Sequence, residues 1–324
     1  MHFARAFFVS LLLNLSLLLH AQKTPNVIII YADDLGYGDL GSYGATKIST
    51  PVLDQLALEG LRFTHAHSTS ATCTPSRYAL MTGEYPWRKK GTGVLPGDAA
   101  LIIEQGRHTL PQVFKQAGYN TAIVGKWHLG LGDAVDKNWN VPIKPGPNEI
   151  GFDYAFIFPA TADRVPTVFI ENHEVIGADP ADPIEVSYKQ KIGNDPTGKE
   201  NPDLLKMKNS LNHGHNMTIV NGIGRIGWMK GGTKARWTDE EMPLSFLNKS
   251  REFIRKNKDK PFFLFYSLTE PHVPRMPSTV FKGRSGLGYR GDAILQIDWA
   301  VGEIMNELKS LQIDNNTLVI FTSD

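Results

Sequence analysis

Short apolar runs alternate with amphipathic stretches along most of the chain, which is the pattern of an α/β domain. The run at 26–31, Asn-Val-Ile-Ile-Ile-Tyr, is continuous and rich in β-branched residues, so it predicts a strand that is buried on both faces. Similar runs predict further strands at 121–124, 154–158, 261–268 and 317–324. Strands and helices in alternation favour one domain with a largely parallel sheet.

Apolar residues between these runs recur at helical spacing. Thr50-Pro51 predicts an N-cap followed by Pro at the first helical position, and the helix is expected to end at Gly60. Leu61 to Ser68 are interpreted as a short strand or an extended segment. Further helices are predicted between Thr109 and Gly118, at 240–258 and at 289–311.

Residues 160–237 do not follow this pattern. They are rich in Pro, Gly, Asn and Lys and have little periodicity, so we interpret them as a long insertion on the scaffold. Insertions of this kind usually carry specificity rather than the core chemistry.

The N-terminus predicts export. A small positive region precedes an apolar run at 7–19, and a small residue, Ala21, ends the segment. This is the pattern of a secretory signal peptide with cleavage after Ala21, and the run is too short to span a membrane comfortably. We therefore expect residues 1–21 to be removed, residues 22–324 to form the domain, and the protein to be periplasmic or secreted.

Composition narrows the possible partners. Of 324 residues, 41% are hydrophobic and 21% are charged, which describes an ordinary globular protein, and a net charge of +1 gives no argument for a nucleic-acid or membrane partner. The single cysteine, Cys73, excludes an internal disulfide. By itself such a residue is most simply a small buried hydrophobe.

Polar, chemically able residues follow four of the predicted strands, namely Asp33-Asp34, Lys126 with His128, His272 and Asp324. The carboxyl ends of parallel strands share one edge of a sheet, so these side chains should meet there. Each acid alone could simply cap a turn. Three gathered acids would repel one another unless a cation lies among them, and carboxylate oxygens favour Ca²⁺ or Mg²⁺. The gathered basic groups would suit a tetrahedral oxyanion such as sulfate or phosphate.

At these residues the chain resembles the type I sulfatases. Cys73-x-Pro75-Ser76-Arg77-x-x-x-Met81-Thr82-Gly83 is similar to their first signature, and Gly118-Tyr119-x-Thr121-x-x-x-Gly125-Lys126-x-His128 to their second. The Asp33-Asp34 loop, Pro271-His272-x-Pro274 and Thr322-Ser323-Asp324 also fall where that family has them. The resemblance covers most of residues 25–324 and implies the alkaline-phosphatase-like α/β/α sandwich.

The resemblance also implies a mechanism. Cys73 would be oxidised by a maturation enzyme to formylglycine, whose hydrate offers one hydroxyl to attack sulfur and a second to expel the bound sulfate. The resemblance implies that Asp33, Asp34 and Asp324, with the oxygen of residue 73, hold one divalent cation, expected to be Ca²⁺. It implies that Lys126 polarises the sulfate, that Arg77 stabilises the hydrate and that Asp324 also accepts the nucleophile's proton. His128 would be the base that releases sulfate, and His272, with Lys126, would protonate the leaving alcohol.

The resemblance includes one departure. The family pattern continues after the position of Asp324 with a cation-binding Asn and a sulfate-contacting Lys, and then with a smaller C-terminal subdomain. The sequence ends at Asp324 and is therefore interpreted as truncated, with weakened metal binding and low activity expected.

The expected substrate is a sulfated sugar or polysaccharide fragment. His173 and His215, both in the insertion, are predicted substrate contacts because histidines suit hydrogen bonds with sugar hydroxyls, although ordinary loop hydrogen bonding would also explain them. Two alternatives stay open. A phosphate-ester hydrolase of the same superfamily would use Ser or Thr and usually two zinc ions, and a non-catalytic remnant would bind sulfated glycans without releasing sulfate.

Overall fold

The computed structural model of the protein describes residues 24–207 and 214–324. The predicted signal peptide, residues 1–21, lies outside these residues. Within them, no helix combines the length and the apolar character needed to cross a membrane.

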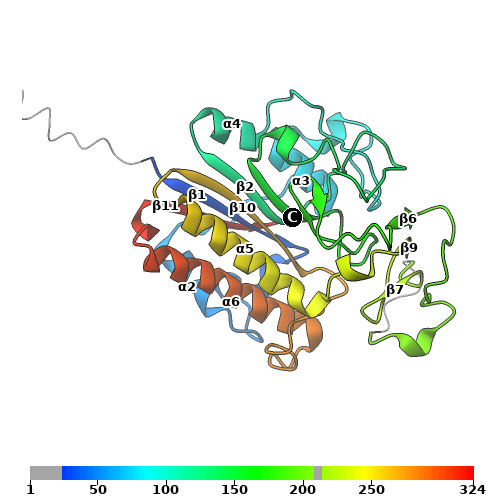
Figure 1. Cartoon of the computed structure of the whole chain (residues 1–324). Helices are drawn as coiled ribbons and strands as arrows, with labels where there is room; N and C mark the ends of the chain where they lie inside the picture. The colour runs from blue at the N-terminus through cyan, green and yellow to red at the C-terminus, as the bar shows by residue number, and fades with distance from the viewer. Residues whose placement is uncertain (1–23, 208–213) are drawn as a thin grey trace, which may run out of the picture.

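A seven-stranded sheet forms the centre of the molecule, in the order β11-β1-β10-β2-β3-β4-β5 (Figure 1). The pairs from β11 to β3 are parallel, and β4 and β5 add antiparallel at one edge. The largely parallel sheet predicted from the sequence is therefore confirmed. Its strands are β1 (Asn26–Asp33), β2 (Asn120–Lys126), β3 (Tyr154–Phe158), β4 (Ile170–Glu171), β5 (Glu174–Val175), β10 (Phe262–Pro271) and β11 (Thr317–Ser323).

Helices cover both faces of the sheet, as an α/β/α sandwich requires. One face packs against α2 (Pro51–Glu59), α5 (Met242–Asn257) and α6 (Gly288–Ser310). The other face packs against α3 (Cys73–Thr82) and α4 (Leu110–Gln116). Short 3-10 helices lie at Tyr37–Asp39, Gly41–Tyr43, Pro86–Arg88, Asn148–Ile150, Pro202–Leu204, Thr233–Ala235, Asp239–Glu241 and Asp314–Asn316.

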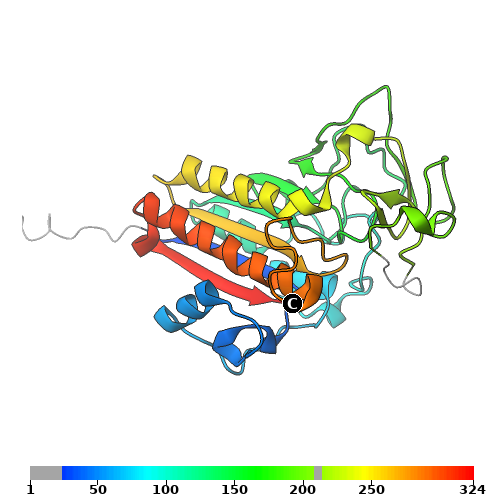
Figure 2. The ribbon, with the colours of Figure 1, turned by 90° about the horizontal axis from the view of Figure 1, so that it is seen from below.

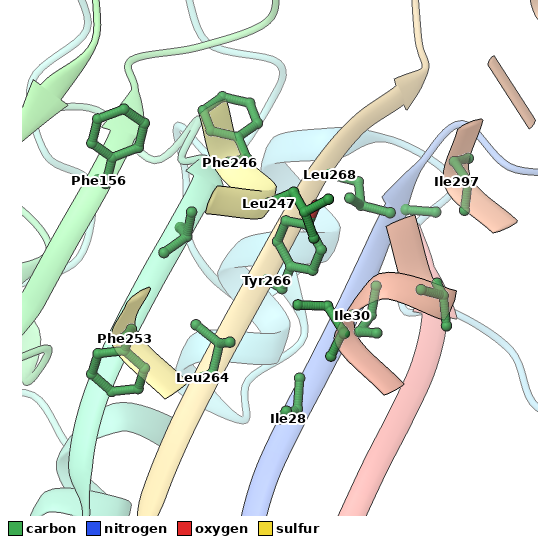
Figure 3. Packing of buried hydrophobic residues seen from close by; sticks show 14 of the residues in the cluster. Ile28, Ile30, Phe156, Phe246, Leu247, Phe253, Leu264, Tyr266, Leu268 and Ile297 are labelled. Atoms are coloured by element: carbon green, nitrogen blue, oxygen red, sulfur yellow. The ribbon is translucent and has the colours of Figure 1, made fainter. Parts of the chain in front are cut away.

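The alternation of side chains along the strands builds two hydrophobic cores. On β1, Ile28 and Ile30 point to the α5 and α6 side, where Leu264 and Tyr266 of the neighbouring β10 lie beside them (Figure 3). Val27 and Ile29 belong to the core on the opposite face. Burying a side chain of this size contributes about 1.5–3 kcal/mol to the free energy of folding. The strands are therefore stabilised by the apolar side chains that pack on both faces of the sheet.

The structure differs from the sequence-based expectations at three elements. β11 is not fully buried, since Leu318 and Ile320 are 53% and 40% exposed on this edge strand. Residues 61–68 form no strand. Thr50 precedes α2 as predicted, but its hydroxyl donates to Asp54 instead of capping the helix, because that carboxylate lies within reach at 3.1 Å.

The predicted insertion, 160–237, is only partly an addition to the scaffold. Its hairpin β4-β5 completes the central sheet, because Glu171 pairs with Phe156 of β3. The remainder carries the small pairs β6 (Glu185–Ser187) with β9 (Trp228–Lys230) and β7 (Ile219–Val220) with β8 (Ile223–Gly224). This part extends beyond the carboxyl ends of the strands (Figure 1, Figure 2).

Candidate active site

Four neighbouring strands deliver polar residues to one edge of the sheet. Asp33 ends β1, Lys126 ends β2, β10 leads to His272, and β11 leads to Asp324. These strands are adjacent in the order β11-β1-β10-β2, so the predicted meeting of their ends is found. Cys73 reaches the same place from the other layer, as the first residue of α3.

A buried ionic cluster lies at the base of the site. Lys126 Nζ donates to Asp33 Oδ2 at 2.5 Å, and Arg77 Nη2 donates to Asp33 Oδ1 at 3.3 Å. All three side chains are at most 1% exposed. Burial disfavours the charged carboxylate, but the surrounding cations outweigh it and hold the pKa of Asp33 well below its ordinary value. Asp33 is therefore a fixed negative charge.

Ser267 and Tyr31, neither of which was predicted from the sequence as a site residue, orient Arg77. Its Nη1 donates to Ser267 Oγ at 2.5 Å and to the Lys126 carbonyl at 3.1 Å. Its guanidinium lies over the ring of Tyr31, 5.0 Å from the ring centre. A lone serine inside the apolar run of β10 was the available signal for Ser267. Tyr31 carried no comparable signal.

His128 has one hydrogen-bonded ring nitrogen and one that is not. Its Nε2 lies 2.9 Å from the Leu95 carbonyl, so Nε2 carries the proton and donates. Its Nδ1 is buried and, among the described residues, has no hydrogen-bond partner. Burial and the nearby charge of Lys126 hold the pKa of His128 well below its ordinary value. The ring is therefore neutral and offers a free lone pair at Nδ1.

Acidic side chains from both ends of the chain converge around Cys73. One ligand atom from each of Asp33, Asp34, Cys73 and Asp324 lies within 4.8 Å of the others. Asp324 Oδ1 accepts the Asp34 backbone N–H at 2.9 Å, while Asp324 Oδ2 is buried without a hydrogen-bond partner in the described structure. Burial and the charge of Asp33 raise the pKa of Asp324 to about 6. An orphaned buried carboxylate oxygen beside two further carboxylates fits an oxygen-seeking divalent cation.

His272 lies on the open side of these acids. Its Nε2 is 3.7 Å from Asp34 Oδ2, and its Nδ1 lies 2.8 Å from the Val273 carbonyl. Burial alone would lower the pKa of His272, but Asp33 and a hydrogen bond with Cys73 are among the contacts that raise it to about 9. At neutral pH this ring holds a proton that it can donate.

An open pocket of about 460 Å³ lies above Cys73 and His272. Its far wall comes from the insertion, where His215 Nε2 and Asp163 Oδ2 are 2.8 Å apart and Arg164 Nη1 donates to Asp163 Oδ1 at 3.1 Å. His215 therefore lines this pocket, and its contact with substrate stays a prediction. Asp163 was not singled out from the sequence.

His173 is not at the pocket. It sits in the β4-β5 turn, where the backbone N–H of Asn172 donates to the Ala155 carbonyl near the start of β3. His173 therefore lies toward the amino-terminal end of β3, away from the carboxyl ends of the strands where the site is built. Its Nε2 is 2.9 Å from Glu149 Oε1. The prediction of a substrate contact did not anticipate that a short antiparallel hairpin carries His173 away from the strand ends.

The fold and this arrangement are those of the alkaline-phosphatase-like superfamily. The sulfatase family model matches residues 25–324, and the chain belongs to this family, among its type I members. The resemblance stated from the signature residues is thus confirmed.

Individual relatives agree with this assignment. The chain is 56% identical to an N-acetylgalactosamine-6-O-sulfatase of Bacteroides thetaiotaomicron over 94% of its own length, and 34% identical to human arylsulfatase A over 97%. It spans 59% and 54% of the lengths of these two proteins. A solved B. thetaiotaomicron sulfatase structure, from work on glycosaminoglycan metabolism, superposes with a TM-score of 0.90 at 54% identity, covering 93% of this chain and 62% of that one.

Proposed function

We propose that the protein hydrolyses the sulfate ester of a sulfated sugar, with formylglycine at position 73 and one bound divalent cation. The observation that carries this proposal is the meeting of Cys73 with three carboxylates and with His272, in a pocket above a buried Asp33–Lys126–Arg77 cluster. A thiol alone would be a poor ligand for a hard cation, whereas a hydrate oxygen at the same position suits one. The Sγ atom of Cys73 therefore stands in for that oxygen.

The carboxylates of Asp33, Asp34 and Asp324 would hold the cation, for which we propose Ca²⁺. When bound there, the cation would polarise the sulfate oxygens and offset the repulsion among the acids. The formylglycine hydrate would supply a hydroxyl that attacks sulfur and a second that allows sulfate to leave. The position of residue 73 at the start of α3 also places developing negative charge near the helix N-terminus.

The remaining roles belong to side chains of the chain itself. Lys126 and Arg77 supply fixed positive charge beneath the sulfate, and Lys126 is kept in place by Asp33. His128 has the free Nδ1 lone pair that a base needs in the step that releases sulfate. His272 holds the proton that the leaving alcohol requires. A bound cation would lower the pKa of His272 and so make that proton easier to donate.

The substrate proposal rests on the wall of the pocket and on the relatives. His215, Asp163 and Arg164 present hydrogen-bonding groups opposite Cys73, which suits sugar hydroxyls. Because the Bacteroides relative is named for 6-O-sulfated N-acetylgalactosamine, that sugar is the first substrate to test. His173 has no part in this proposal.

The deciding experiment compares the protein, produced with a formylglycine-generating enzyme, with the Cys73→Ala variant. Mass spectrometry of the peptide that contains residue 73 should show conversion of the thiol to the aldehyde. Sulfate release from 6-O-sulfated N-acetylgalactosamine should occur only in the converted protein, and an aryl phosphate should be a poor substrate. An unconverted thiol in active protein, or faster turnover of the phosphate, would reject the proposal, and binding without release would favour a non-catalytic glycan-binding protein.

We also propose export through residues 1–21, on the sequence pattern alone. The mass of the mature protein from its host should then correspond to a chain that begins at Gln22.

A further inference from the structure

The backbone of Asp34 adopts a conformation that its own side chain does not explain. Its φ is +63°, in the left-handed region that non-glycine residues seldom occupy, although Asp and Asn enter it more readily than other side chains do. Such a conformation is strained and persists only where the surroundings impose it. The Asp34 side chain is 46% exposed and contributes little anchoring. The structure around the backbone must therefore hold Asp34.

Both backbone polar groups of Asp34 are engaged. Its N–H donates to Asp324 Oδ1 at 2.9 Å, and its carbonyl accepts from Arg290 Nη2 at 3.3 Å. The next residue, Leu35, donates its N–H to Ser323 Oγ at 3.2 Å. One side of the Asp34 peptide is thus held by the end of β11, and the other by Arg290 of α6.

Arg290 is itself fixed by a bidentate ion pair. Its Nη1 and Nη2 donate to Asp39 Oδ1 and Oδ2 at 2.7 Å and 2.6 Å. Asp39 Oδ2 also accepts the Gly36 N–H at 2.7 Å, so the same carboxylate ties down the loop that follows Asp34. A planar fork of two parallel hydrogen bonds fixes orientation as well as distance.

The position of Arg290 has no explanation in the stability of its helix. It lies in the first turn of α6, where a positive charge opposes the helix dipole. The rest of α6 is packed on the sheet through Ile294, Ile297 and Val301. Arg290 therefore connects the loop of Asp34 to a rigid element.

We propose that Arg290 and Asp39 form a clamp that holds Asp34 in the orientation needed to bind the cation. Both are positioning residues, since neither provides a ligand atom in the acidic group around Cys73. The inference rests on the metal site of the proposed function. Groups that orient metal ligands typically account for about 10–100-fold in metal affinity.

The test is calorimetric titration of the full chain with CaCl₂ alone. Arg290→Gln and Asp39→Asn should each raise the Kd for Ca²⁺ by about 10–100-fold. Arg290→Lys keeps the charge but not the fork, so it should behave like Arg290→Gln. The matched control is Arg284→Gln, because Arg284 is exposed and has no ion pair in the described structure. It should leave the Kd unchanged.

Hydrogen exchange in calcium-free buffer provides a second readout. Amides of Leu35 and Gly36 should exchange faster in Arg290→Gln than in the wild type, because the clamp is lost. Equal calcium affinity or equal exchange in the two proteins would overturn the clamp while leaving the proposed function intact. A wild-type chain that binds no Ca²⁺ would instead overturn the proposed metal site, and the clamp with it.

Discussion

Arg77 is a buried cation whose hydrogen bonds depend on the shape of its guanidinium. Its Nη2 donates to Asp33, and its Nη1 donates to Ser267 and to the Lys126 carbonyl. A lysine could keep the charge but could not reach these partners together. Replacing Arg77 with lysine therefore tests the hydrogen-bonding geometry of the guanidinium while the positive charge is kept.

Arg77→Lys should lower the free energy of unfolding by about 1–3 kcal/mol, because a buried acceptor is left without its donor. Urea denaturation of the wild type and the variant measures the difference. Arg284→Lys, at an exposed position, should change it by less than about 0.5 kcal/mol. A loss for Arg77→Lys no larger than this control would contradict the assigned contacts.

His128 should make stability depend on pH. Its pKa in the folded protein lies well below the unfolded value of about 6.5, so the unfolded chain binds more protons at acid pH. The sign follows directly: this contribution is present above pH 6.5 and is lost as the pH falls, at up to about 1.4 kcal/mol per pH unit. His128→Gln removes the titrating group, so urea midpoints between pH 7 and pH 5 should decline less steeply in the variant. Identical slopes would show that His128 does not titrate as its burial requires.

At the scale of single elements, α6 links the hydrophobic core to the site. Ile304 is fully buried in the core between α6 and the sheet, whereas Asn306 on the same helix is exposed. Ile304→Ala should cost about 2–5 kcal/mol in free energy of unfolding, and Asn306→Ala less than about 0.5 kcal/mol. Both are measured by urea denaturation. Similar values for the two variants would mean that this face of α6 is not packed as described.

The sequence predicted those elements that are long enough to show a regular pattern of hydrophobic residues. The strands β1, β2, β3 and β10 and the helices α5 and α6 have strong periodic patterns, and the sequence located them. Because parallel strands end at one edge, the sequence also brought Asp33, Lys126, His272 and Asp324 together. β4 and β5 have only two residues each, too short for a pattern, and so the position of His173 was missed. The exposure of β11 depends on its place at the sheet edge, which local hydrophobicity does not report.

Partners set by tertiary structure were also beyond the sequence. Ser267 reaches Arg77 only because β10 lies beside β2 and opposite α3. Asp163 reaches the pocket only because the insertion folds back over the strand ends. Neither contact follows from residue spacing.

For the molecule as a whole, the acidic site should couple cation binding to folding. A cation bound only by the folded state at 100 times its Kd raises the free energy of unfolding by about 2.7 kcal/mol. Ca²⁺ should therefore stabilise the wild type against urea. Asp34→Asn should abolish this effect, because it removes one ligand charge.

The same variant supplies its own control in EDTA. The Asp34 side chain is half-exposed, and Asn tolerates its left-handed backbone, so the two proteins should then agree within about 0.5 kcal/mol. Calcium stabilisation of equal size in wild type and Asp34→Asn would reject the proposed ligands.

The strand order also has a consequence in time. β1 lies between β10 and β11. The Asn26 side chain accepts the backbone N–H of Phe262, 236 residues away at the start of β10, and donates to the Thr317 hydroxyl, 291 residues away at the start of β11. Contacts so distant in sequence form slowly, and the first strand made must wait for the last. Cys73 is only 5% exposed in the folded protein. An enzyme that oxidises this thiol therefore has to act before folding is complete. The time available to it is the interval between synthesis of the α3 segment and pairing of β11 with β1.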